Sequence, residues 1–220
     1  MDQSKWPARA VLPVAVPGVK FIVLTILITG MLFYFGWPVI AWCSLAATCF
    51  VCWFFRDPER KGPEGEKDFL SPADGRVIIV DRLARSPYME GECQKVSIFM
   101  NVFNVHVNRI PFDGIIQRVK YNPGRFFNAS LDKASVHNER NALIVKTLRG
   151  KTYAVVQIAG LIARRIVNCV KAGDPVERGG RYGMIQFGSR LDLYLPMDFE
   201  ILVKPGDKTR AGASVIGYMN

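Results

Sequence analysis

The chain has very few histidines and no regular cysteine framework. Its 220 residues include only two histidines, His106 and His137, and histidine is the residue type whose ordinary pKa lies near neutral pH. The five cysteines are odd in number and irregular in spacing, which argues against a disulfide framework and favours a reducing compartment. Cys49 and Cys52 form a single CxxC pair without a second pair or a nearby histidine, so we expect no metal site.

Charge is absent from one long segment near the N-terminus. From Phe21 to Phe55 there is no Asp, Glu, Lys, Arg or His. A straight helix of that length would extend about 50 Å, whereas the hydrocarbon core of a bilayer is about 30 Å thick. Because Gly36 and Pro38 favour a break, we predict two apolar stretches, Phe21–Phe35 and Val39–Phe55. A tight hairpin, two tilted spans, or one span with an interfacial piece would fit these lengths.

Basic residues flank this apolar segment on both sides: Lys5, Arg9, Lys20, Arg56, Arg60 and Lys61. Such flanks favour a cell-membrane protein whose remaining residues lie on the cytoplasmic side. The net charge of +10 suits nucleic acid, an anionic membrane surface or an anionic substrate. With a membrane segment present, we expect an anionic phospholipid and the membrane surface as partners, and no nucleic acid. A cleaved signal peptide fits less well, because its apolar region would be much shorter.

We predict a basic tail at residues 1–20, the apolar segment at 21–55, and one β-rich domain at 56–220. Long patterns of helical period are scarce in this last part, and short β-branched runs between Gly, Pro, Asp and Asn are typical of a sandwich or barrel. The runs are 77–80, 96–103, 115–121, 142–148, 153–158, 165–170, 184–187, 191–195 and 200–203.

A short internal repeat supports the β-rich prediction. The pattern V-K-x-G-D-x₄-G begins at Val170 and again at Val203. Gly-Asp favours a tight turn after a strand, and the second glycine permits another. Similar turns occur in lipoyl- and biotinyl-type domains, so we expect two related strand–turn units packed together.

Three candidate residues stand in short polar segments. His106 would share a strand face with Asn104 and Asn108, a row that usually lies on a solvated face but could line a site. Asp74 lies in a turn signature, and its carboxylate could orient a histidine. Ser189 follows Gly188 between two apolar runs, which by itself indicates a hairpin turn.

Taken in order, these segments resemble the phosphatidylserine decarboxylase proenzymes, specifically the short bacterial (type A) form. The resemblance runs from about residue 56 to the C-terminus and is strongest from Arg181 to Pro196. It rests on Ser71-Pro72-Ala73-Asp74-Gly75, Asn104-Val105-His106-Val107-Asn108-Arg109 with Pro111, Asn138-Glu139-Arg140-Asn141, and Phe187-Gly188-Ser189-Arg190 with Asp192.

The resemblance implies a carboxy-lyase that cuts itself between Gly188 and Ser189. The products would be a β chain of residues 1–188 and an α chain of residues 189–220, which remain partners. Ser189 would become a covalent pyruvoyl group, the cofactor, and form a Schiff base with the amine of phosphatidylserine. Loss of carbon dioxide would give phosphatidylethanolamine. A homo-oligomer is left open.

The same resemblance implies that His106 is the base that activates Ser189, and that Asp74 is the carboxylate that orients His106. The longer relatives carry H-x-x-H-x-P, and here Arg109 takes the place of the second histidine, the usual charge-relay residue. His106 therefore serves both steps, or another group such as His137 is the base. Rival hypotheses are a membrane-bound serine hydrolase with an intact Ser189, a lipoyl-like adaptor, and the same chemistry on an ether-linked serine lipid.

Overall fold

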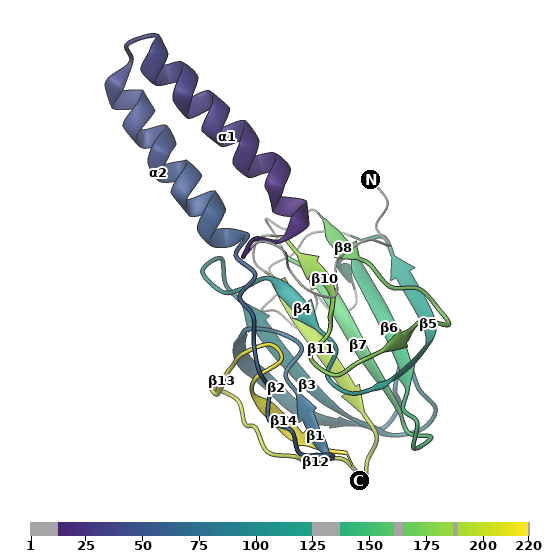
Figure 1. Cartoon of the computed structure of the whole chain (residues 1–220). Helices are drawn as coiled ribbons and strands as arrows, with labels where there is room; N and C mark the ends of the chain where they lie inside the picture. Colours follow the sequence, from purple (N-terminus) through teal and green to yellow (C-terminus); the bar gives the residue numbers. More distant parts are fainter. Residues whose placement is uncertain (1–12, 125–136, 161–164, 187–188, 220) are drawn as a thin grey trace. The chain divides into compact units, whose positions relative to one another are not determined.

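The structure is a computed structural model that describes residues 13–124, 137–160, 165–186 and 189–219 (Figure 1). The chain divides into two compact units, one within residues 9–59 and one that contains residues 60–220. The first consists of helices and the second of strands. The prediction of a mainly β chain with an N-terminal apolar helical segment is therefore confirmed.

Two apolar helices make up the first unit. Helix α1 spans Val16–Tyr34 and helix α2 spans Pro38–Phe54 (Figure 1). Gly36 adopts the left-handed backbone conformation between them (φ 72°), and Pro38 is the first residue of α2, where a missing N–H is tolerated. Among the described residues, α1 is the one helix that is long and apolar enough to cross a membrane, and α2 is shorter.

Hydroxyl groups connect the two helices. The Thr29 Oγ1 atom lies 2.7 Å from Ser44 Oγ and 3.1 Å from Thr48 Oγ1. Small polar side chains of this kind hold apolar helices together where lipid removes the hydrophobic driving force. The outward faces carry exposed aliphatic and aromatic side chains, so the helix pair as a whole presents an apolar surface.

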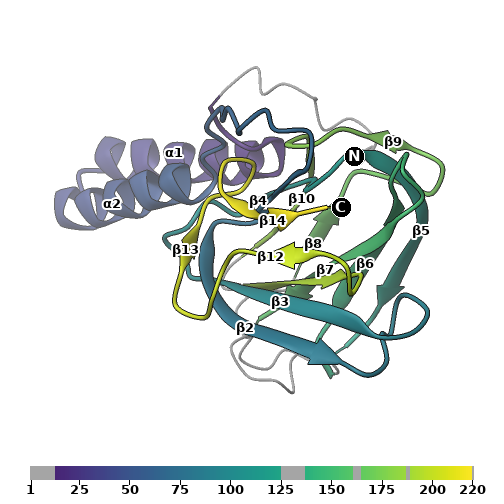
Figure 2. The same ribbon diagram turned by 90° about the horizontal axis from the view of Figure 1, so that it is seen from below.

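The second unit is built on a curled eight-stranded antiparallel sheet (Figure 2). In spatial order its strands are β13 (Lys208–Thr209), β2 (Gly75–Leu83), β3 (Cys93–Met100), β11 (Ser189–Leu195), β7 (Thr152–Ala159), β6 (Arg140–Lys146), β5 (Gly114–Asn122) and β9 (Pro175–Val176). Two smaller sheets accompany it: β1 (Asp68–Leu70), β14 (Val215–Tyr218) and β12 (Glu200–Ile201), and β4 (Val107–Arg109), β10 (Arg181–Ile185) and β8 (Ile166–Asn168).

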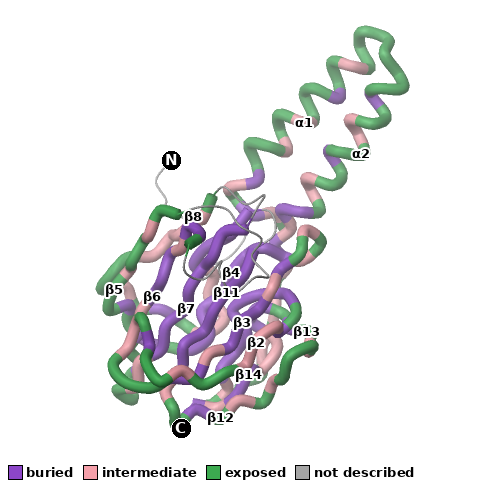
Figure 3. Tube along the Cα trace, turned by 180° about the vertical axis from the view of Figure 1, so that it is seen from behind, coloured by how far each residue is buried: buried purple, intermediate pink, exposed green. Residues whose placement is uncertain are grey.

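The core lies on the inner face of the large sheet. All residues of the central strand β11 are buried, and the central strands are the most deeply covered part of the molecule (Figure 3). Every predicted β-branched run overlaps an observed strand. The run at 96–103 continues too far, because β3 ends at Met100, where asparagine side chains begin to bond the backbone.

The strands form two lobes of matching topology. We define the first lobe as β1–β3 with β11–β14, and the second lobe as β4–β6 with β7–β10. Each lobe contributes four neighbouring strands to the large sheet and one small sheet, and the lobes meet where β11 pairs with β7. The two V-K-x-G-D turns occupy matching places, with Gly206 (φ 101°) in the first lobe and Gly173 (φ 90°) in the second.

A further repeat, absent from the predictions made from sequence, also relates the two lobes. The sequence Pro-x-Asp-Gly precedes β2 in the first lobe and β5 in the second. Asp74 Oδ1 accepts a hydrogen bond from the backbone N–H of Ala211 (2.8 Å), and Asp113 Oδ1 accepts one from that of Arg178 (2.7 Å). The lobes thus repeat both strand order and side-chain contacts.

Candidate active site

Ser189 is the first residue of the central strand. Its backbone lies between Met100 of β3 and Ala159 of β7, so it is held from both sides. The side chain is fully buried, and its Oγ has no hydrogen-bond partner in the part of the chain that the structure describes. A buried hydroxyl without a partner is unfavourable, which is typical of a residue kept for chemistry rather than for stability. Gly188 lies outside the described residues.

The hairpin interpretation of Gly188-Ser189 is wrong. The preceding strand β10 pairs with β4 and β8 in a small sheet, whereas β11 pairs with β3 and β7 in the large one. Strands β10 and β11 therefore belong to different sheets and do not form a hairpin with each other. A local pattern of apolar run, turn and apolar run is the same for both arrangements, so the sequence alone could not separate them.

His106 is not on a strand and is not solvated. It directly precedes β4, and its side chain is fully buried, as is that of Asn108. Asn104 lies in a turn instead, where its Oδ1 accepts a hydrogen bond from the backbone N–H of Asn101 (2.9 Å). The predicted row on a solvated face is therefore wrong, and the reading in which these residues line an interior site gains support.

Backbone and side-chain contacts bring the His106 segment against neighbours of Ser189. The carbonyl oxygen of His106 accepts a hydrogen bond from the backbone N–H of Ile185 (3.4 Å), four residues before Ser189. Asn108 Nδ2 lies 3.8 Å from the sulfur of Met100, the residue directly opposite Ser189. The segment that contains His106 and Asn108 thus lies against neighbours of the first residue of β11.

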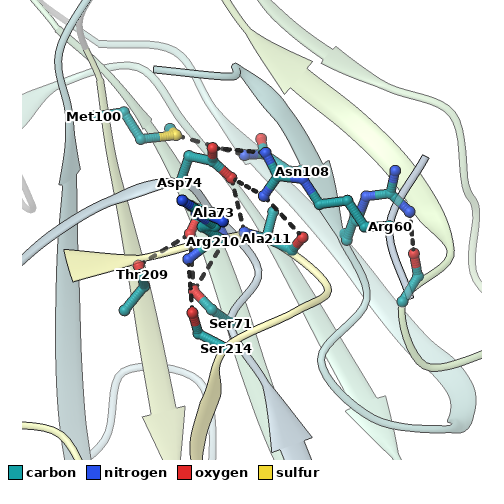
Figure 4. A network of polar contacts seen from close by, with 12 residues as sticks. Arg60, Ser71, Ala73, Asp74, Met100, Asn108, Thr209, Arg210, Ala211 and Ser214 are labelled. Carbon is teal, nitrogen blue, oxygen red and sulfur yellow. Dashed lines mark hydrogen bonds and ion pairs between the residues drawn. The ribbon is translucent and has the colours of Figure 1, made fainter. Parts of the chain in front are cut away.

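Asp74 forms a two-pronged ion pair that the sequence did not reveal (Figure 4). Arg60 Nη1 lies 2.5 Å from Asp74 Oδ1, and Arg60 Nη2 lies 2.8 Å from Oδ2. With the N–H of Ala211, these donors fix the carboxylate, and both side chains are largely buried. In the sequence, Arg60 is one of the basic residues that follow the apolar segment, and nothing in its local pattern pairs it with residue 74.

Arg109 and His137 bear on which group acts as the base, and they differ in how exposed their side chains are. Arg109, at the place of the second family histidine, is buried, and its Nη1 donates to the carbonyl oxygen of Gly179 (2.9 Å). His137 is exposed, although the next residue, Asn138, donates from Nδ2 to the carbonyl oxygen of Ala159 (2.7 Å) beside Ser189. Burial therefore favours His106 over His137 as a group acting on the buried serine.

A buried ionic cluster stabilises the strand behind Ser189. Arg190 Nε donates to Asp192 Oδ1 (2.6 Å), and Arg190 Nη2 donates to Ser97 Oγ (3.1 Å). Lys95 Nζ lies 3.4 Å from Asp192 Oδ2. Because side chains alternate along a strand, this cluster lies on the face opposite to Ser189. It fixes the register of β11 against β3 without occupying the site.

Comparisons with known proteins agree with this arrangement. A family model described as phosphatidylserine decarboxylase matches residues 47–217. A phosphatidylserine decarboxylase proenzyme of Syntrophus aciditrophicus is 52% identical over 93% of this chain and 96% of its own length. Proteins with the same name from Geotalea uraniireducens (46%, covering 94% of this chain and 97% of the relative) and Burkholderia lata (50%, covering 85% of each) are also similar.

Fold, site and relatives together define a carboxy-lyase rather than a serine hydrolase or an adaptor. The chain belongs to the phosphatidylserine decarboxylase family. The resemblance inferred from the four motifs is thereby confirmed, as is the prediction of a decarboxylase. The apolar helix α1 is compatible with association with a membrane.

Proposed function

We propose that this chain is a proenzyme that cleaves itself between Gly188 and Ser189, and that the product converts phosphatidylserine to phosphatidylethanolamine and carbon dioxide. The observation that carries the proposal is the buried hydroxyl of Ser189 at the start of the central strand. The names of the relatives support it, because they describe proenzymes of a phosphatidylserine decarboxylase.

Self-cleavage would begin with attack of Ser189 Oγ on the carbonyl carbon of Gly188. The hydroxyl proton passes to a base, the peptide C–N bond breaks, and the freed amine takes up a proton, which leaves an ester. Loss of the α-proton of Ser189 then breaks the ester, so that residue 188 ends in a carboxylate. The remaining dehydroalanine takes up water and releases ammonia to leave a pyruvoyl group.

His106 is our candidate for the base and Asp74 for the carboxylate that orients it, because a serine hydroxyl needs such a base. The ion pair with Arg60 supports a fixed position for Asp74. The buried start of β11 fits a covalent pyruvoyl group formed in place, because Ser189 itself is its source. When present, that group supplies a carbonyl that draws electrons from the breaking C–C bond of the bound serine headgroup.

We further propose that α1 and α2 attach the enzyme to the bilayer that contains its substrate, with the β-rich unit on the cytoplasmic side. The apolar helices, in which Lys20 of α1 is the one charged residue, and the basic residues beside them support this placement. A diacyl lipid could then be processed without leaving the membrane.

The intact mass of the purified, denatured protein tests the proposal. We expect two chains, residues 1–188 and 189–220, with the shorter chain blocked to N-terminal sequencing. Ser189→Ala should yield one uncut chain without decarboxylase activity, whereas Ser86→Ala, a buried serine in a distant loop, should be cut normally. Activity in the uncut Ser189→Ala chain would refute the mechanism. Assays with ester- and ether-linked serine lipids would establish the lipid class.

A further inference from the structure

A cavity of about 640 Å³, lined by both polar and apolar side chains, opens among residues of β5, β6 and β8. Its polar lining residues are Tyr121, Glu139, Asn141, Arg165 and Asn168. The volume falls within the range of about 300–1,000 Å³ that is typical of small-molecule sites. None of these residues has a role in the self-cleavage described above, so the cavity needs a separate explanation.

The cavity and Ser189 lie on the same face of the large sheet. Ser189 pairs with Ala159 on β7, and the N–H of Ala159 donates to the carbonyl oxygen of Glu139 (2.9 Å), the residue directly before β6. Neighbouring strands lie about 4.8 Å apart, so the backbones of Ser189 and Glu139 are roughly 10 Å apart. Glu139 thus brings the wall of the cavity close to the reacting strand.

A row of buried amides links the two places across the same face. Gln157 Nε2 donates to Asn108 Oδ1 (2.9 Å), and Asn141 Nδ2 donates to Gln157 Oε1 (3.2 Å). Asn108 in turn contacts Met100, the partner of Ser189. This continuous hydrogen-bonded row joins the cavity wall at Asn141 to the surroundings of the serine, and it holds the wall in a fixed conformation.

The cavity carries one charge of each sign. The carboxylate of Glu139 belongs to a residue that is only 8% exposed, and Arg165 supplies a guanidinium group. Partial desolvation and a hydrogen bond to Glu139 raise the pKa of Tyr121, which agrees with a negative charge in this wall. Asn168 Oδ1 is buried without a hydrogen-bond partner within the described ranges.

We infer that this cavity binds the zwitterionic phosphoserine headgroup, with its ammonium group toward Glu139 and its phosphate toward Arg165. The inference rests on the proposed function, because that function defines the substrate. A buried carboxylate is stabilised by a cationic group, and a guanidinium group suits phosphate. The order also agrees with the chemistry, since the amine must lie nearer to Ser189 than the phosphate does.

Binding of glycerophosphoserine to the full-length Ser189→Ala chain in detergent micelles, measured by calorimetry, tests this inference. That chain cannot form a pyruvoyl group, so the result does not depend on whether the normal chain cuts itself. We expect Glu139→Gln and Arg165→Gln each to weaken binding about tenfold or more. Arg118→Gln is the matched control, because Arg118 is exposed on β5 beside Val119 and should leave binding unchanged.

Ligands that lack one group separate the two ends of the cavity. Glycerophosphate has no amine, so its binding should be weakened by Arg165→Gln and not by Glu139→Gln. Circular dichroism melts would verify that each variant is folded. The inference would be overturned if glycerophosphoserine does not bind, if both variants bind it like their parent, or if inorganic phosphate binds as tightly, since the last result would indicate a simple phosphate site.

Discussion

The two lobes share one arrangement of strands, but they differ in how the paired central strands of each lobe are connected. In the second lobe, β6 and β7 are joined by a tight turn in which Thr147 N–H donates to the carbonyl oxygen of Lys151 (2.8 Å) and Gly150 is left-handed (φ 81°). At the matching place in the first lobe, β3 ends at Met100 and β11 begins directly opposite, at Ser189. In the second lobe this place is occupied by a hairpin turn. In the first lobe no hairpin turn joins β3 to β11, and β11 begins there with the candidate reactive residue Ser189.

A second difference lies at the matching aspartates. Asp74 and Asp113 each accept a hydrogen bond from the backbone of the neighbouring turn, but Asp74 is buried with Arg60 while Asp113 is exposed. The shared hydrogen bond therefore serves the fold, and the ion pair is an addition of the first lobe. A duplicated scaffold can retain its structural contacts in one copy and acquire chemistry in the other.

The largest expected difference between the lobes follows from these aspartates. Asp74→Asn leaves Arg60 largely buried without its anionic partner, which should lower the free energy of unfolding by about 3 kcal/mol and slow self-cleavage at least tenfold. Asp113→Asn, at an exposed site, should change stability by less than about 1 kcal/mol and leave cleavage intact. Mass spectrometry over time and thermal melts measure both effects. Equal losses in the two variants would break the comparison.

Two glycines should instead respond alike, because they serve the shared scaffold. A Cβ added to Gly75 would lie 2.2 Å from the carbonyl oxygen of Phe99, and one added to Gly114 would lie 2.6 Å from that of Lys146. Both contacts are with backbone, so each change to alanine should lower stability by about 1–3 kcal/mol. Gly30→Ala, with no atom near the added group, is the control. Melting temperatures that fall for only one lobe would contradict the repeat.

The smallest difference concerns two tyrosines of the second lobe, Tyr153 and Tyr182, which stand where the first lobe has Leu191 and Ile216. Both tyrosines are fully buried, and burial raises the pKa of each phenol above its ordinary value. A raised pKa of the folded state contributes stability that is complete below about pH 10 and is lost as the pH rises further.

We therefore expect the melting temperature of the normal chain to fall as the pH rises from 9 to 11, and a Tyr153→Phe, Tyr182→Phe double variant to fall less steeply. At pH 7 the double variant should lose only about 1 kcal/mol, chiefly because Tyr153 no longer donates to the carbonyl oxygen of Phe112 (2.6 Å). Tyr218→Phe, at a half-buried position, serves as the reference. Parallel curves for the double variant and the normal chain would remove the alkaline role of these residues.

The sequence revealed those parts of the fold that are encoded locally. Alternation and β-branching located the nine longer runs, and the Gly-Asp pairs located two turns. The short strands β4 and β9 lay in no predicted run, unlike the equally short β8 and β12, and they are defined by the partner strands that pair with them. The Pro-x-Asp-Gly repeat was present in the sequence, but its two copies differ at most neighbouring positions.

The site was predictable only as a set of motifs. Ser189, His106 and Asp74 were identified by their order along the chain, and the structure describes where each lies. Arg60 could not be found, because its partner lies 14 residues away and no local pattern connects them. The burial of His106 was equally hidden, since it depends on packing between sheets and not on the residues beside it.

The placement of β11 has one consequence for the mature enzyme. Residues 189–220 contain the strands β11–β14, which all belong to the first lobe. Strand β11 is hydrogen-bonded to β3 on one side and to β7 on the other. Cleavage before Ser189 would therefore produce a heterodimer whose interface is the interior of a folded domain. The formation of such a complex needs no association step and does not depend on concentration, because its subunits are assembled before they become separate molecules.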